Sequence, residues 1–415
     1  MTLRDRLVRL RETPPVAVAP PAPPQRAQPD LTRWVPGWEY AGPSGTCFVG
    51  EQEFPVETRH GHYRLGALLR AEGWLFGYLG GDPAFDEIDL DRTAFLDTET
   101  TGLAGGTGTF AFLVGVGYYA AGPEGPRSRF VVRQYLMRDP GEEPALLDAL
   151  ADLLAGFSAV ITFNGRAFDW PLIETRYRLS RRRLPLADPL HLDLLFPARR
   201  VWRHRLESCA LKDLEPPVLG VRRRDDVPGW LIPGLYFQFQ RDRDPRPLAP
   251  VFSHNLLDIL SLTTLAARLA TVVADPAKID PADAYGAGRL YEARGRLDRA
   301  IACYETALEA GLPAVLRQRC TRRLSILYKR DRQWPAAVAL WERCCAEPEA
   351  DLFGHLELAK YYEHVARDLR RAVKVVDQAL LMLEVGSLTA GRPAGLRREW
   401  EQRRRRVQLK LRGRA

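Results

Sequence analysis

The sequence predicts an α/β domain, in which helices flank a mixed β-sheet, followed by an all-α domain of helical repeats. Two observations carry this prediction. Between residues 91 and 275, short apolar segments of strand length alternate with longer segments of helical periodicity, an order that favours a sheet covered by helices. From about residue 283 only helical periodicity remains, and it recurs along the chain, as in proteins built from stacked helices.

The α/β part opens with three strand-like segments. Residues 93–97 and 110–119 form apolar runs, and residues 129–136 alternate apolar and polar side chains, which is the period of a half-buried strand. Glycines between the first two segments supply turns. The later elements are expected as a helix over 143–155, a buried strand over 159–163, a helix over 168–181 and a helix over 253–272.

The helical part carries small and aromatic residues at recurring positions, which is typical of stacked helix pairs. The set recurs after 37 residues and then once more with one inserted residue: Gly288, Tyr291, Gly295, Ala300, Tyr304 and Ala307; Ser325, Tyr328, Ala337, Trp341 and Cys344; Ala359, Tyr362, Ala372, Val376 and Ala379. The first unit resembles a tetratricopeptide repeat. Three such units are about the minimum for a stable stack.

Composition divides the chain into further segments. The expected boundaries are a short helix and Pro-rich linker over 1–29, an extension over 30–90, the α/β domain over 91–275, the repeats over 280–390 and a basic tail over 391–415. The formal net charge is +8, and residues 392–415 account for all of it with ten Arg or Lys and two Glu. Such a tail can bind phosphates or be a solvated helix end.

No feature of the sequence indicates export, membrane insertion or zinc binding. The charged N-terminus has no apolar signal segment, and no uninterrupted apolar stretch approaches the ~20 residues that span a bilayer. We therefore expect a cytoplasmic protein that makes no membrane contact. The six cysteines include no C-x-x-C pair, and Cys209, five residues after His204, has no second ligand pair beside it.

Three short segments carry the candidate chemistry. Asp97 and Glu99 lie two residues apart at the end of the first strand, so both carboxylates share one face. Two like charges there need a compensating cation, and hard divalent ions take oxygen ligands. The alternative is a strand that runs into a polar turn, with Glu99 exposed.

The second segment follows the buried strand, and the third lies on the last helix of the α/β part. Asn164 reaches a turn and Asp169 opens the next helix, where an aspartate is also a common N-cap. His254 and Asp258 are four residues apart and share one helical face. Their alternative is a histidine at a helix start with a solvent-facing aspartate.

Together the three segments resemble the DEDD exonucleases of the RNase H-like class, which include the proofreading domains of DNA polymerases and DnaQ-like enzymes. The resemblance covers about residues 92–272, and the D-x-E-T-T-G element at 97–102 is its most specific part. With repeats after the nuclease domain, the arrangement is similar to the bacterial YprB-like group. The resemblance implies a metal-dependent 3′→5′ exonuclease acting on single-stranded DNA or RNA ends.

By this resemblance, four carboxylates bind two Mg²⁺ or Mn²⁺ ions: Asp97, Glu99, Asp169 and Asp258. His254 orients or deprotonates the attacking water, and two divalent ions activate that water and stabilise the leaving oxygen. The resemblance further implies that Thr100, Gly102, Leu103 and Asn164 line the site for the terminal nucleotide.

The histidine departs from the pattern of the family. In the histidine branch the residue lies five positions before the last aspartate, whereas here it lies four positions before, at the spacing of the tyrosine branch. One residue rotates a helical side chain by about 100°.

Arginines over 176–183 and 199–205 fit either a rim that binds the phosphate backbone or solvated surface charge.

Two other functions remain open from the sequence. In one, the chain is an inactive or weakly active nucleic-acid-binding scaffold whose repeats recruit a protein partner. In the other, it is an RNase H-type endonuclease that cuts RNA in hybrids, although that type usually places its carboxylates differently.

Overall fold

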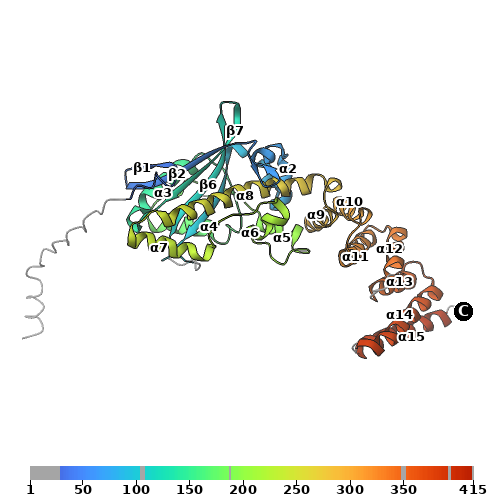
Figure 1. Cartoon of the computed structure of the whole chain (residues 1–415). Helices are drawn as coiled ribbons and strands as arrows, with labels where there is room; N and C mark the ends of the chain where they lie inside the picture. The colour runs from blue at the N-terminus through green and yellow to red at the C-terminus, as the bar shows by residue number, and fades with distance from the viewer. Residues whose placement is uncertain (1–28, 103–107, 187, 347–351, 391–393, 414–415) are drawn as a thin grey trace, which may run out of the picture.

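The computed structural model describes residues 29–102, 108–186, 188–346, 352–390 and 394–413 of the chain. An α/β body lies at one end of the molecule, and the helices after residue 280 extend from it as an arm that leads to the C-terminus (Figure 1). This arrangement confirms the predicted fold class. The helix and most of the linker expected over 1–29 lie outside the described residues.

A seven-stranded mixed sheet forms the centre of the body, in the order β1-β2-β7-β6-β5-β8-β9. Strand β5 pairs antiparallel with β6 and parallel with β8, so it lies where the sheet changes its pairing direction. The strands are β1 (Gly37–Gly42), β2 (Gly45–Pro55), β5 (Thr93–Thr100), β6 (Ala111–Gly122), β7 (Gly125–Leu136), β8 (Ala159–Thr162) and β9 (Leu190–Asp193), with a separate pair β3 (Arg59–His60) and β4 (Tyr63–Arg64).

The extension expected over 30–90 contributes to this sheet. Strand β2 pairs with β7 over eight residues, and β1 continues the sheet outward from β2. Phe48 on β2 is fully buried and meets Phe252 edge to face at 6.0 Å. These strands were not predicted because the segment mixes aromatics, glycines and charges without strict alternation.

Helices cover both faces of the sheet. Helix α8 packs on one face, and α3 and α4 pack on the other through apolar residues such as Leu150 and Ile173. The helices of the body are α2 (Gly73–Gly80), α3 (Glu143–Leu154), α4 (Asp169–Leu179), α5 (Leu195–Trp202), α6 (Leu211–Leu214), α7 (Ile232–Asp242) and α8 (Ala249–Ala274), with a π turn at Glu215–Leu219 and short 3₁₀ turns at Leu65–Arg70, Pro83–Glu87, Leu90–Arg92, Pro140–Glu142, Gly229–Leu231, Arg246–Leu248 and Pro276–Lys278.

Helix α8 is the central helix of the body. The stretch Arg246–Ala274 is long and apolar enough to cross a membrane, but 72% of its most apolar window is buried inside the fold, as expected for a core helix. Two glycines of β6 allow its close approach: a Cβ on Gly115 would lie 2.1 Å from Asn255 Oδ1, and one on Gly117 would lie 2.5 Å from Ile259 Cγ2.

The arm consists of helices that pack one after another in chain order. Small residues lie at the predicted crossings: Ala300, Ala337 and Ala372 are fully buried, and a Cβ on Gly288 would lie 2.5 Å from the ring of Tyr304. Their assignment to tetratricopeptide repeats stays a prediction. The helices are α9 (Pro281–Ala293), α10 (Leu297–Glu309), α11 (Ala314–Arg330), α12 (Trp334–Ala346), α13 (Leu352–His364), α14 (Leu369–Ala390) and α15 (Ala394–Arg412).

The basic segment expected as a tail over 391–415 differs from that expectation. Residues 394–412 form α15, which packs on α14 and buries Trp400 and Val407. Arg406 and Lys410 pair with Glu363, whose side chain is inaccessible to solvent. Although burial opposes it, these ion pairs lower the pKa of Glu363 to about 2. Much of the charge in this segment therefore closes the end of the helical stack.

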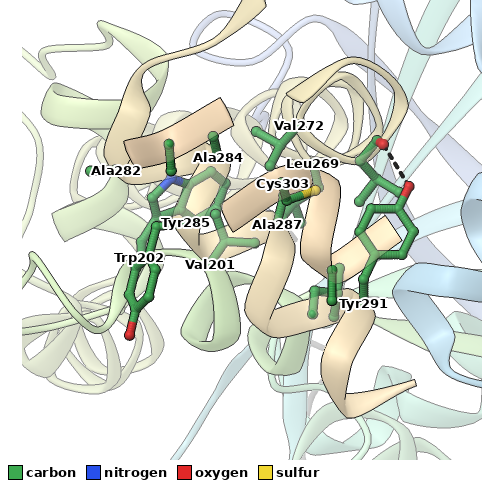
Figure 2. Close-up of a cluster of buried hydrophobic side chains, with 14 of the residues drawn as sticks. Val201, Trp202, Leu269, Val272, Ala282, Ala284, Tyr285, Ala287, Tyr291 and Cys303 are labelled. Carbon is green, nitrogen blue, oxygen red and sulfur yellow. Dashed lines mark hydrogen bonds between the residues drawn. The ribbon is translucent and has the colours of Figure 1, made fainter. Parts of the chain in front are cut away.

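The first helix of the arm shares a hydrophobic core with the body. Figure 2 shows Val201 and Trp202 of α5, together with Leu269 of α8, packed around Ala284 and Ala287 of α9. All five side chains are buried. The α/β body and the start of the arm are therefore joined by continuous packing rather than by a linker.

A buried carboxylate fastens the same junction. Asp283 on α9 is inaccessible to solvent and accepts hydrogen bonds from Trp202 Nε1 at 3.0 Å, Arg205 at 2.6 Å and Arg268 at 2.5 Å. These donors come from α5, the residues after it, and α8. One side chain of α9 thus connects the end of α5 and the residues after it with α8.

Replacing Asp283 by alanine is expected to lower the free energy of unfolding by about 3–5 kcal/mol, because it leaves partly buried cations without their counter-charge. Thermal unfolding followed by circular dichroism measures this. The control is Asp280→Ala, which removes only the N-cap of the same helix and should cost about 1 kcal/mol. Equal losses from the two substitutions would contradict the role assigned to Asp283.

Candidate metal and nuclease site

Strand β5 presents two carboxylates at its carboxyl end. Asp97 and Glu99 share one face of the strand, and both are only partly accessible. Asp97 Oδ2 accepts a hydrogen bond of 2.9 Å from Asn255 Nδ2 on α8. Asn255 is fully buried, and its Oδ1 accepts in turn from Gln134 Nε2 at 2.9 Å. This chain of amides fixes the orientation of Asp97.

The next strand delivers a third carboxylate to the same end of the sheet. After β8 the chain turns through Asn164, whose φ is +67°, and Asp193 stabilises the turn by accepting the backbone N–H of Asn164 at 2.7 Å. Asp169 then opens α4, and its Oδ1 accepts a hydrogen bond from Thr98 on β5. Asp193 ends β9 as a turn-forming residue.

Helix α8 contributes the fourth carboxylate and a histidine. His254 Nε2 lies 3.4 Å from Asp258 Oδ2, as the spacing of four predicts. One ligand atom each from Glu99, His254 and Asp258 lie within 4.8 Å of one another. The side chains of His254 and Asp258 are 15% and 17% exposed, so the cluster is open to solvent only at its edge.

The four carboxylates lie near enough for their charges to affect one another. Burial, followed by the charges of Asp258, Asp169 and Glu99, raises the pKa of Asp97 well above its usual value. Burial, then Asp258 and Asp169, does the same to the pKa of Glu99. Burial also raises the pKa of Asp258, and that of Asp169 to about 6. The structure thus brings together the four acids that the sequence singled out.

A partly buried arginine partly neutralises this cluster. The guanidinium of Arg223 donates to Asp258 Oδ1 and to Glu215 Oε1, the latter at 2.5 Å, and lies 3.1 Å from Asp226 Oδ2. Glu215 is buried, and the Arg223 side chain is 8% exposed. Arg223, Glu215 and Asp226 were not predicted from the sequence, since they come from a Pro- and Arg-rich segment without periodicity.

Asp226 also holds His254. His254 Nδ1 lies 2.8 Å from Asp226 Oδ1, so the carboxylate favours the tautomer with its hydrogen on Nδ1. Nε2 then faces Asp258 and the acidic cluster. The shift of the histidine by one residue, noted in the sequence, is accompanied by a carboxylate that orients the ring.

The residues predicted to hold the terminal nucleotide are only partly described. Thr100 Oγ1 donates to the carbonyl of Gly102 at 2.9 Å, which shapes the turn after β5. A Cβ on Gly102 would meet no atom of the described residues within 4 Å. Asn164 lines a cavity of about 480 Å³ beside the end of β8. Leu103 lies outside the described residues.

Two of the arginines over 176–183 fit neither of the interpretations that the sequence left open. Arg176 is buried, donates to Glu143 and stacks on Phe110 with its guanidinium 3.9 Å from the ring centre. Arg182 pairs with Asp148 at 2.7 Å. Both arginines therefore stabilise α4 against its neighbours. Arg199 and Arg200, by contrast, are exposed on α5.

Comparison with known proteins agrees with this architecture. A family model described as RNase_H superfamily matches residues 94–270, which contain all four acids and His254. The chain is 34% identical over 340 residues to YprB of Bacillus subtilis (strain 168), a protein described as uncharacterized, and the match covers 80% of each chain. The chain belongs to the family of YprB and contains an RNase H superfamily domain. Its RNase H-like domain implies a nuclease that binds nucleic acid and uses divalent metal.

The donor set fits such a metal. Four carboxylates and no thiolate converge in the RNase H-like site, and hard divalent ions such as Mg²⁺ and Mn²⁺ prefer oxygen ligands. The raised pKa values of Asp97 and Glu99 express an excess of negative charge that Arg223 alone does not balance. A bound cation would remove this excess.

Proposed function

We propose that the protein is a 3′→5′ exonuclease that hydrolyses phosphodiester bonds at single-stranded nucleic acid ends with two bound divalent ions. The observation that carries the proposal is the convergence of four carboxylates with a carboxylate-oriented histidine in an RNase H-like domain. The cutting direction and the exo mode are supported by the resemblance of the D-x-E-T-T-G element to the DEDD exonucleases.

In this proposal Asp97, Glu99, Asp169 and Asp258 hold two Mg²⁺ or Mn²⁺ ions. When bound, ions of this kind lower the pKa of a water and neutralise charge on the leaving 3′ oxygen. The hydrogen bonds from Asn255 to Asp97 and from Thr98 to Asp169 keep two of the ligands oriented. Ligands that hydrogen bonds already hold in place need less rearrangement to bind a metal ion.

His254 is proposed to accept the proton of the attacking water at Nε2. Asp226 supports this role because its Oδ1 lies at hydrogen-bond distance, 2.8 Å, from Nδ1 of His254. The carboxylate would also stabilise the imidazole ring once the ring is protonated. Thr100, Gly102 and Asn164 are proposed to contact the terminal nucleotide. No atom of the described residues would crowd a Cβ on Gly102, which is consistent with a nucleotide that approaches the backbone there.

The test is stepwise shortening of 5′-labelled DNA and RNA oligonucleotides in Mn²⁺, resolved on a denaturing gel. We expect a ladder that begins at the 3′ end and disappears in EDTA and in Asp97→Ala. An absence of shortening, or shortening that persists in Asp97→Ala, would contradict the proposal. A hybrid substrate with both ends blocked should stay intact, and internal cuts would indicate an RNase H-type endonuclease instead.

One observation favours a second candidate, a weakly active scaffold. Arg223 donates to Asp258, so one ligand oxygen of Asp258 already has a cationic partner. If that pairing outcompeted metal, the domain would bind ends without cutting while the arm recruited a protein partner. Capture of a partner by the full chain, together with no cleavage at saturating Mn²⁺, would support this candidate.

A further inference from the structure

An arginine-lined groove runs from the RNase H-like site to the arm. Three cavities of about 480, 530 and 550 Å³ share lining residues: Arg199 and Arg203 belong to the first two, and Arg203 and Arg289 to the last two. They are therefore parts of one depression. It begins beside Asn164 at the end of β8, passes along α5 and α9, and reaches Arg319 on α11.

The groove adjoins the acidic site. Asp193, which lines the middle cavity, contributes to raising the pKa of Asp169, and its side chain holds the turn that contains Asn164. A nucleic acid strand whose end lay among the four carboxylates would contact the groove with its next nucleotides.

Five arginines of the groove have no carboxylate partner in the part of the chain that the structure describes. Among the described residues, no carboxylate forms an ion pair with Arg199, Arg200, Arg203, Arg289 or Arg319. Nearby arginines that serve the fold differ, since Arg205 pairs with Asp283 and Arg323 pairs with Glu292. The structure thus leaves these five cations available to a ligand.

Arg289 carries the strongest sign of a missing ligand. Its Nε is buried and has no hydrogen-bond partner among the residues that the structure describes. Burial, together with repulsion from Arg323 and Arg200, lowers its pKa. The positive charges of Arg289, Arg323 and Arg200 repel one another, which destabilises the unliganded protein. A bound anion would offset this repulsion.

An exposed aromatic lies in the same groove. Phe196 on α5 is 57% exposed and lines the middle cavity beside Arg199 and Arg200. Basic side chains that follow a sugar-phosphate backbone, with an aromatic ring on which a base stacks, are the combination that binds single strands without sequence preference.

We propose that this groove, formed by Phe196, Arg199, Arg200, Arg203, Arg289 and Arg319, binds the phosphate backbone of the single strand whose end enters the RNase H-like site. The inference rests on the proposed function for the position of that end. In this proposal the first helices of the arm hold substrate. An arm that only recruited a protein partner would not need this groove.

The test is direct binding by the full chain in EDTA, so that cleavage plays no part. Fluorescence anisotropy with labelled single-stranded DNA and RNA of about twenty nucleotides is compared for wild type and Arg203→Glu/Arg319→Glu across a range of salt. We expect at least a tenfold loss of affinity and a salt slope lower by about 1.4, from two lost phosphate contacts at about 0.7 each.

The matched control is Arg343→Glu/Arg370→Glu, which makes the same change of charge at two exposed arginines of α12 and α14 that line none of the three cavities. It should bind as wild type does. Equal losses in both double variants would overturn the groove, as would wild-type affinity in Arg203→Glu/Arg319→Glu. Competition by polyglutamate as effective as that by an unlabelled oligonucleotide would overturn it in favour of an acidic protein.

Two further measurements keep the outcomes separate. Circular dichroism confirms folding, and Arg203→Ala/Arg319→Ala replaces the reversed variant if that variant fails to fold. Oligonucleotides of about four nucleotides should bind wild type and the groove variant more nearly alike than long ones. Groove binding without any cleavage would overturn the proposed function alone, whereas cleavage without groove binding would overturn this inference alone.

Discussion

Asp169→Asn is expected to abolish cleavage and, without metal, to stabilise the folded protein. The substitution preserves the shape of the side chain, and its Oδ1 can still accept the hydrogen bond from Thr98. It removes one negative charge from a set that binds two cations. We expect a fall in cleavage rate of at least about 10³-fold, because two-metal catalysis depends on complete ligation.

The gain in stability follows from the pKa of Asp169, which burial raises to about 6 from 3.8. An acid whose pKa is raised in the folded state favours its neutral form, so its ionisation at pH 7.5 costs the fold up to about 3 kcal/mol. Asparagine is always neutral and avoids that cost. Thermal unfolding in EDTA should therefore show a higher melting temperature for Asp169→Asn than for wild type.

The same pKa sets a pH dependence with a definite sign. Between about pH 4 and pH 6 the folded protein keeps a proton on Asp169 that the unfolded chain releases, so stability falls as pH rises through this window. Asp169→Asn should flatten that part of the profile. The control is Asp188→Asn at an exposed aspartate, and a lower melting temperature for Asp169→Asn than for this control would contradict the argument.

The sequence predicts those parts of the molecule in which local periodicity controls structure. Alternation along β5 put Asp97 and Glu99 on one face, and the spacing of four put His254 beside Asp258; the structure agrees with both. Small residues at helix crossings predicted the arm because close packing of helices leaves no room for larger side chains.

The sequence did not predict contacts that only the tertiary fold creates. Arg223 and Asp226 reach the site from an irregular segment, and no periodicity connects them to α8. The last helix was expected to be a basic tail. Its partner Glu363 lies more than 40 residues away in the sequence, so the local sequence does not reveal their ion pairs. Asn255 lies between His254 and Asp258 in the sequence, but its hydrogen bond to Asp97 and its contact with Gly115 arise only from the tertiary fold.

The second large effect is expected from Asp226→Asn, which should reduce kcat by roughly 10²-fold with little change in KM. Asp226 Oδ1 lies 2.8 Å from His254 Nδ1 and favours a hydrogen there, which leaves Nε2 able to accept a proton. The amide of asparagine can instead donate to Nδ1. The ring would then carry its hydrogen on Nε2 and could not accept the proton of water, a step worth about 10²–10⁴-fold in rate.

The measurement separates this effect from a loss of metal. Asp226 is not one of the four proposed ligands, so the Mn²⁺ concentration that gives half-maximal rate should stay near that of wild type while the maximal rate falls. A shift in that concentration would instead indicate that Asp226 acts through Arg223, which lies 3.1 Å from its Oδ2, and hence through Asp258.

Asp225 provides a matched control beside Asp226. It is exposed and has a φ of +55°, a conformation that asparagine adopts readily, so Asp225→Asn removes the same charge without disturbing the turn. It should cleave as wild type does. If both variants kept the wild-type rate, the histidine would need no orienting carboxylate, and the one-residue shift of His254 would have to be explained by another route for the proton.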